Sequence, residues 1–152
     1  MSDVVLVFPK SSFLEKAMKH VYLPLALLNS VVFVEKEYSV KIIDQRIDSN
    51  WKNNLLKELK KKPLCVGVTS LTGEQIKYAL EISKIVKEES DVPVVWGGAH
   101  ANILPEQTLR NEYVDFVIQG EGEILFLRET LGHSFLAYQS PYLSLSGKER
   151  WE

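Results

Sequence analysis

The stretch that decides the fold is residues 64–98, LCVGVTSLTGEQIKYALEISKIVKEESDVPVVWGG. It begins with the short apolar run Leu64–Val68 and ends with another, Val92–Trp96, and such runs are typical of buried strands. The apolar or small residues that fall on one side of a helix between these runs are Ile76, Ala79, Leu80, Ser83 and Val86. Thr72 and Gln75 have the spacing of a capping box, which predicts the start of this helix. The stretch therefore predicts a strand, a helix and a second strand.

The same alternation extends to both sides of this unit. Further short apolar runs that predict strands are Val4–Phe8, Val40–Ile43 and Val114–Ile118. Further segments that predict helices are Pro24–Glu37, Trp51–Lys61, Glu106–Arg110 and Glu121–Leu131. Five strands that alternate with five helices predict an α/β, flavodoxin-like (Rossmann-like) three-layer fold. Its five-stranded parallel sheet is expected to have the order 2-1-3-4-5.

The alternation stops near the end of the sequence. We expect residues 1–131 to form the α/β domain and residues 132–152 to form an irregular C-terminal tail or a swapped arm. The aromatic residues of this tail, which stand among serines, are Phe135, Tyr138, Tyr142 and Trp151.

Composition and charge exclude several classes of protein. The chain has 152 residues, 45% hydrophobic and 25% charged, which suits one globular domain with a real core. Its formal net charge of −2 gives no basic surface for nucleic acid. No secretory signal precedes Val4, and the longest apolar stretch, Val21–Val34, is too short to span a bilayer. The sequence thus predicts a cytoplasmic protein with neither nucleic acid nor membrane as a partner.

Cys65 is the single cysteine. One cysteine excludes an internal disulfide and a cysteine-rich zinc or iron–sulfur site on this chain. Because Cys65 falls inside an apolar run, we expect it to be a small core residue.

Ligands of open parallel sheets lie beyond the carboxyl ends of the strands, where the strand order reverses. For the predicted order, that crevice lies between the first and third strands. The loops around it are Pro9–Phe13, Thr69–Gly73, Gly97–Asn102 and Gln119–Glu123, which hold most of the glycines. This clustering predicts a ligand site at these loops.

The loop after the third strand and the loop after the fourth each allow two interpretations. Thr69, Ser70 and Thr72 offer hydroxyls to a polar or anionic ligand group, or Thr72 caps the helix while the other hydroxyls meet water. Gly97 and Gly98 let a bulky ligand approach the backbone, or let the chain turn with positive φ.

Three further residues of these loops are candidates. His100 is a candidate ligand or proton donor, although a lone loop histidine is more often structural. Gly120 and Glu121 stand between the fifth strand and a predicted helix, whose positive N-terminus by itself accounts for a carboxylate. Glu121 could also hold a hydroxyl or an amide of a ligand.

Several common site motifs are absent from the sequence. Asp44 ends the second predicted strand, where dinucleotide-binding enzymes bind a ribose. That role requires a Gly-x-Gly-x-x-Gly after the first strand, which Pro9–Phe13 lacks, so binding of a nicotinamide dinucleotide is not expected. Neither a P-loop nor a Gly-x-Ser-x-Gly elbow occurs, and Thr69 stands where a receiver domain needs an aspartate.

The order and spacing of these segments resemble the cobalamin-binding domain at the N-terminus of many radical S-adenosylmethionine enzymes. The resemblance runs from Val4 to Phe126 and is strongest over Pro93–Ala101. The other segments that carry it are Pro24–Leu28, Val40–Asp44, Val66–Gly73, Val114–Ile118 and Gly120–Glu123.

This resemblance implies a flavodoxin-like domain that receives the lower face and the nucleotide tail of a corrinoid. It implies that the hydroxyl of a Ser/Thr-x-Leu motif, here Thr69-Ser70-Leu71, contacts the base of the tail, and that Gly97 and Gly98 leave room for it. The residues expected in the pocket are Thr69, Ser70, Leu71, Thr72, Gly97, Gly98, Ala99, His100, Gly120 and Glu121.

The sequence departs from the family pattern in two places. The loop Pro9–Ser12 lacks the histidine of an Asp-x-His-x-x-Gly motif, so we expect cobalamin without a lower axial histidine from the protein. The radical half of such enzymes holds a [4Fe–4S] cluster on Cys-x-x-x-Cys-x-x-Cys, and with one cysteine this chain is expected to hold no such cluster.

The sequence therefore predicts a cobalamin-binding module, not catalytic alone, that presents a corrinoid to a separate radical S-adenosylmethionine chain. The first alternative is a non-binding relic of the fold that acts as a scaffold and forms homo-oligomers through its C-terminal tail. A small hydrolase or flavin enzyme is a second alternative, for which the sequence offers no nucleophile–base pair.

Overall fold

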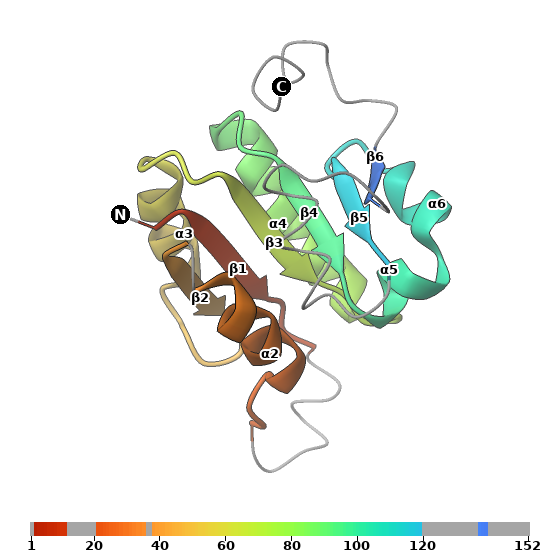
Figure 1. Ribbon diagram of the computed structural model, residues 1–152, viewed down its shortest axis with the longest axis horizontal. Helices are drawn as coiled ribbons and strands as arrows, with labels where there is room; N and C mark the ends of the chain where they lie inside the picture. Colours follow the sequence, from red (N-terminus) through yellow and green to blue (C-terminus); the bar gives the residue numbers. More distant parts are fainter. Residues whose placement is uncertain (1, 12–20, 36–37, 120–136, 140–152) are drawn as a thin grey trace.

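The computed structural model of the protein describes residues 2–11, 21–35, 38–119 and 137–139. These residues contain one sheet, whose strands are β1 (Val4–Phe8), β2 (Val40–Asp44), β3 (Cys65–Thr69), β4 (Val94–Gly97), β5 (Phe116–Ile118) and β6 (Ala137–Gln139). The first five are parallel neighbours in the order β2-β1-β3-β4-β5 (Figure 1). The predicted five-stranded parallel sheet and its order 2-1-3-4-5 are therefore confirmed.

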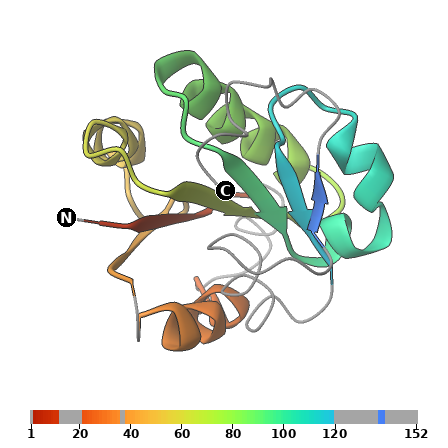
Figure 2. The same ribbon diagram turned by 45° about the horizontal axis from the view of Figure 1, so that its top comes forward.

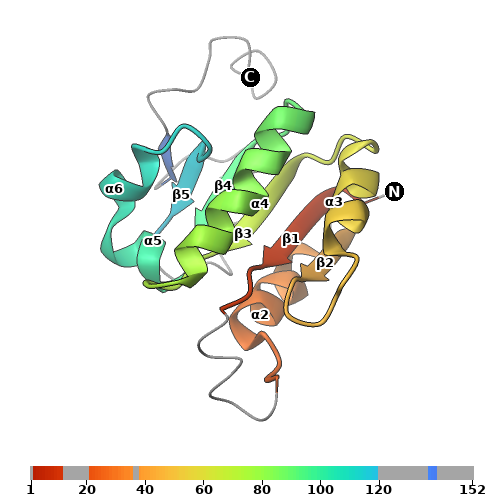
Figure 3. The same ribbon diagram turned by 180° about the vertical axis from the view of Figure 1, so that it is seen from behind.

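Helices cover both faces of this sheet. The described helices are α2 (Leu25–Val34), α3 (Trp51–Leu59), α4 (Gln75–Glu89), α5 (Ala99–Ile103) and α6 (Pro105–Leu109). α3 and α4 lie on one face (Figure 3), and α2 lies on the other (Figure 2). Among the described residues, no helix combines the length and the apolar character that crossing a membrane requires.

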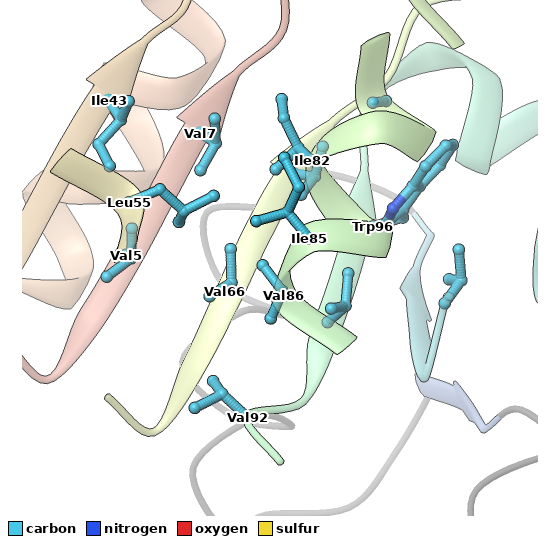
Figure 4. Packing of buried hydrophobic residues seen from close by; sticks show 14 of the residues in the cluster. Val5, Val7, Ile43, Leu55, Val66, Ile82, Ile85, Val86, Val92 and Trp96 are labelled. Atoms are coloured by element: carbon cyan, nitrogen blue, oxygen red, sulfur yellow. The ribbon is translucent and has the colours of Figure 1, made fainter. Parts of the chain in front are cut away.

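The alternation of side chains along each strand divides the core into two clusters. Val5, Val7 and Val66 pack toward α3 and α4 (Figure 4), and Val68 belongs to the same cluster. Their strand neighbours point the other way, because successive side chains of a strand alternate between faces. The buried residues on the α2 side are Val4, Leu6, Leu27, Val34, Cys65, Val95 and Ile118. Each large apolar side chain buried in this way contributes about 1.5–3 kcal/mol to the stability of the fold.

A buried polar chain explains the one serine on the apolar face of α4. The indole N–H of Trp96 donates to Ser83 Oγ over 2.8 Å, and the Ser83 hydroxyl donates to the Ala79 carbonyl oxygen over 2.9 Å. Both side chains are nearly inaccessible to water, so each polar group depends on this partner. Ser83 therefore belongs on the buried face, as its spacing predicted.

Three features of the sheet edge differ from the prediction. The loop predicted after β4 begins the short helix α5, and β5 starts at Phe116 rather than Val114 because Asp115 bonds the start of β4. Residues 137–139 of the predicted irregular tail form β6, which pairs antiparallel with β5. The predicted helix Glu121–Leu131 and the remainder of the tail lie outside the described residues.

Candidate functional site

The loops that follow β3 and β4 lie side by side at the carboxyl edge of the sheet (Figure 1). Ser70 joins them: its backbone N–H and its hydroxyl both donate to the Gly97 carbonyl oxygen, each over 2.8 Å. The backbone N–H of His100 in turn donates to the Ser70 carbonyl oxygen over 3.0 Å. Ser70 is buried and its hydroxyl proton is used within the fold, so this residue shapes the site.

Gly97 and Gly98, which the sequence pattern does not distinguish, have different roles in the structure. Gly98 has φ +92°, and a Cβ there would lie 2.7 Å from the Ser70 carbonyl oxygen and 2.9 Å from Thr69 Oγ1. Positive φ and close backbone contact both require glycine. A Cβ on Gly97 would meet no atom within 4 Å in the part of the chain that the structure describes. Gly98 thus serves the turn, and Gly97 is the glycine that leaves open space.

Small residues cluster on the α2 side of the sheet at this edge. Val66 and Val68 point toward α4, so the alternation places Gly67 and Thr69 of β3 on the α2 side. Gly97 follows Trp96, which packs toward α4, and therefore faces the α2 side too. Thr69 and Gly97 are neighbours in the β3–β4 register. We call Gly67, Thr69 and Gly97 the small-residue strip; Gly67 was not among the predicted site residues.

The predicted capping box is wrong. The hydroxyl of Thr72 lies 3.1 Å from Nδ1 of His100 instead of capping α4, and Glu74 is the N-cap residue, with no side-chain capping bond. The Thr72–His100 contact holds the loop after β3 against α5. His100 therefore has a structural partner through Nδ1.

Gln75, the other half of the predicted capping box, connects two loops of the crevice. Its Oε1 accepts the backbone N–H of Leu71 over 2.8 Å, and its Nε2 donates to the Pro9 carbonyl oxygen over 2.9 Å. The side chain is buried. A glutamine at the start of a helix signals a capping box equally well, so the sequence could not indicate this role.

Side chains that follow β2 hold the loop after β1 from the other side. Gln45 Oε1 accepts the backbone N–H of Lys10 over 2.9 Å. Arg46 forms an ion pair with Asp44 over 2.6 Å and stacks on the Phe8 ring, 4.1 Å from its centroid. Neither Gln45 nor Arg46 is among the predicted site residues; the contact of Gln45 with Lys10 spans 35 residues of sequence and leaves no local pattern.

The structure describes two of the four remaining predicted site residues. Leu71 and Ala99 are exposed beside the strip. Gly120 and Glu121 lie outside the described residues. Within the described ranges, no group of three or more His, Cys, Asp or Glu side chains is placed to hold a metal ion.

A pocket of about 470 Å³ opens at the opposite, amino-terminal edge of the sheet. Its lining comes from the ends of α3 and α4, and includes Leu56, Lys60 and Asp91. None of the predicted site residues lines this pocket. A substitution in this pocket can therefore serve as a control for substitutions at the carboxyl edge.

Comparisons with known proteins bear on this carboxyl edge. Residues 19–128 match the B12 binding domain family. The uncharacterized methyltransferase PH0819 of Pyrococcus horikoshii is 33% identical over 129 residues, which cover 83% of this chain and 28% of that protein. The cytidylyl-2-hydroxyethylphosphonate methyltransferase of Streptomyces wedmorensis is 27% identical over 146 residues, 82% of this chain and 27% of that protein. The chain thus spans just over a quarter of the length of these curated relatives.

Solved structures show the same fold. The radical S-adenosylmethionine methyltransferase TsrM of Kitasatospora setae, with cobalamin and a [4Fe-4S] cluster bound, superimposes with a TM-score of 0.70 at 22% identity, over 86% of this chain and 24% of TsrM. The cobalamin-dependent S-adenosylmethionine radical enzyme OxsB gives a TM-score of 0.59 at 20% identity, over 99% of this chain and 24% of OxsB. Since the family match covers most of its length, the chain belongs to the B12 binding domain family.

Proposed function

We propose that this chain is a cobalamin-binding module that presents a corrinoid to a radical S-adenosylmethionine catalytic partner. The observation that carries the proposal is the small-residue strip, Gly67, Thr69 and Gly97, at the carboxyl edge beside the reversal of strand order. Membership of the B12 binding domain family supports cobalamin as the ligand of that edge.

The strip suits the nucleotide tail of the corrinoid. Gly97 carries no side chain, and a Cβ there would meet no atom of the described residues within 4 Å, so a flat base can approach the backbone of β4 there. Thr69 lies opposite Gly97 in the β3–β4 register and offers a hydroxyl that both donates and accepts, whereas Gly67, two residues earlier in β3, is buried. In the proposal, Ser70 and Gly98 act indirectly by fixing the two loops, while Leu71, Thr72, Ala99 and His100 form the rim.

The lower face of the corrin would rest near the loop after β1. The ammonium of Lys10 lies 4.7 Å from the centre of the Tyr78 ring, and the Lys10 backbone N–H is bonded to Gln45. Pro9–Ser11 contains no imidazole, so the proposal has no lower axial histidine from this loop. A bound corrinoid supplies a cobalt atom that can carry an alkyl group; the chain's own residues bind and orient it.

The catalytic chemistry is assigned to a partner. Two relatives are methyltransferases, of which the chain spans 28% and 27%. The single cysteine of these 152 residues cannot by itself supply three thiolates to an iron–sulfur cluster. We therefore place the cluster and the methyl transfer on the partner, with the complex in the cytoplasm and without nucleic acid.

Equilibrium dialysis against hydroxocobalamin tests the proposal. We expect the wild-type chain to bind, and Gly97→Leu to weaken binding by about tenfold or more, because a side chain would fill the open position beside Thr69. Lys60→Ala, which changes the pocket at the opposite edge, is the matched control and should bind like wild type. A loss with Lys60→Ala but not with Gly97→Leu would place the ligand at the wrong edge and contradict the proposal.

A further inference from the structure

Gln45 carries a buried hydrogen-bond donor that has no partner. Its side chain is 6% exposed, and its Nε2 is inaccessible and unpaired within the described residues. Buried polar groups are nearly always paired, so an unpaired donor calls for an explanation such as an absent ligand or water.

The orientation of this amide is fixed by its other contacts. The Gln45 backbone N–H donates to the Phe8 carbonyl oxygen over 2.9 Å, which extends the β1–β2 ladder by one residue. Its Oε1 accepts the backbone N–H of Lys10. Because a backbone N–H can only donate, the oxygen must face Lys10, and the unpaired group is the NH2. Rotating the amide by half a turn would place the NH2 against the Lys10 N–H and break that hydrogen bond.

Among the described residues, no group accepts a hydrogen bond from this NH2. The Asp44 carboxylate is occupied by the Arg46 guanidinium through both oxygens, at 2.9 Å and 2.6 Å. The Pro9 carbonyl oxygen already accepts Gln75 Nε2. Gln75 bonds the same loop from the α4 side, and both its amide oxygen and its amide nitrogen have partners. It is therefore an example of a glutamine with a purely structural role at this edge.

We propose that the Gln45 amide donates to a carbonyl oxygen of one of the amide side chains on the edge of the corrin ring. This inference rests on the proposed function. Gln45 follows β2, which is two strands from β3 and so about 10 Å from the small-residue strip. In the proposed function the nucleotide tail occupies the small-residue strip. The part of the corrinoid that could extend from there to Gln45 is then the edge of the corrin ring. Because Nε2 is inaccessible in the free chain, the proposed pairing requires the Lys10 backbone beside it to shift when the corrinoid binds.

The test compares two ligands and four chains: wild type, two Gln45 variants and one control variant. Hydroxocobalamin has the nucleotide tail, whereas dicyanocobinamide keeps the peripheral amides and lacks the tail and its phosphate. Gln45→Met removes the donor, and Gln75→Met is the matched control. Dissociation constants come from equilibrium dialysis, and thermal unfolding of the ligand-free chains reports on the fold. Gln45→Glu is a second variant that keeps the acceptor for Lys10.

The expected result separates binding from stability. Gln45→Met and Gln45→Glu should raise the dissociation constants of both ligands by about five- to tenfold. Gln45→Met should lower the unfolding temperature of the free chain by less than Gln75→Met does, because the one bond that it removes, from the Lys10 backbone N–H, is only partly buried and the donor that it removes has no partner. Gln75→Met should lower that temperature by several degrees, since it removes two bonds made without ligand.

Three results would overturn the inference. Unchanged dissociation constants in both Gln45 variants would show that the donor meets no ligand group. A change confined to hydroxocobalamin would place the acceptor on the nucleotide tail or its phosphate. A wild-type chain that binds neither corrinoid would remove the proposed function and the inference together, whereas wild-type binding with unaffected variants would remove the inference alone.

Discussion

Two adjacent glycines show how much a single residue's surroundings decide. The sequence could identify Gly97-Gly98 as a site feature but could not distinguish the two residues, because positive φ depends on the path of the chain. Only the structure reveals that Gly98 packs on the Ser70 backbone, and that a Cβ on Gly97 would meet none of the described atoms within 4 Å. The same limit applies to Thr72, whose partner His100 is 28 residues away.

A glycine exchange series measures this difference. Gly98→Ala should lower the free energy of unfolding by at least about 2 kcal/mol, because alanine is strained at φ +92° and would meet the Ser70 backbone. Gly97→Ala should change it by less than about 1 kcal/mol. Urea unfolding followed by circular dichroism gives both values. Equal losses in the two variants would refute the separate roles.

The buried thiol provides a second residue-scale prediction. Burial raises the pKa of Cys65 to about 12, and its side chain is fully buried, which confirms the expectation of a core cysteine. The reactive thiolate is therefore scarce in the folded chain from neutral pH up to about pH 10. We expect a thiol reagent at pH 8 to label Cys65 only after unfolding, as followed by mass spectrometry. Rapid labelling of the native chain would contradict the packing of β3 against α2.

At the scale of elements, short apolar runs and helical periodicity were sufficient to locate β1 to β5 and α2, α3, α4 and α6. Their ends shifted by a few residues where side chains bond to the backbone, as Asp115 does at the start of β4. α5 has five residues and begins directly after Gly98, so its periodicity is too short to detect. Gln75 at the start of α4 joins the loops that follow β1 and β3, and no local sequence pattern encodes these contacts.

Asp115 is the element-scale prediction for stability. Its carboxylate accepts the Val94 backbone N–H over 2.7 Å and pairs with Lys87 over 2.8 Å, so it braces β4 against α4. Asp115→Ala should lower the free energy of unfolding by about 2–4 kcal/mol, since it leaves a buried N–H and a partly buried ammonium unpaired.

An exposed ion pair on the same helix provides the control for Asp115. Lys84 and Glu88 are 3.7 Å apart with both side chains more than half exposed, so Lys84→Ala should cost no more than about 0.5 kcal/mol. Urea unfolding of both variants decides the matter. If Asp115→Ala were as stable as Lys84→Ala, the brace would have no energetic role.

At the scale of the whole molecule, the predicted topology and strand order are correct because the sequence pattern strongly constrains them. Alternating strands and helices imply parallel pairing, and right-handed crossovers leave few orders. β6 escaped prediction, because three residues paired with β5 from a distant segment carry no periodic signal. The proposed division of the chain at residue 131 remains a prediction.

Truncation tests the alternative in which the tail forms oligomers. A chain that ends after Gln139 keeps β6, whereas one that ends after Gly132 loses it and leaves β5 as the edge strand. We expect the unfolding temperature to fall only in the shorter chain, and corrinoid binding to survive in the longer one. Light scattering gives the oligomeric state. An assembly that dissociates after removal of residues 140–152, without corrinoid binding, would favour the scaffold.

The visible spectrum of the desalted complex tests the central claim most directly. A nucleotide tail held along the small-residue strip cannot also reach the cobalt atom, so its base must be displaced. We therefore predict that the chain, mixed with methylcobalamin in the dark and passed over a desalting column, retains the corrinoid with a base-displaced spectrum. Thr69→Val should retain less of it. A protein fraction without corrinoid, or a retained corrinoid whose spectrum shows the base still on cobalt, would contradict the account.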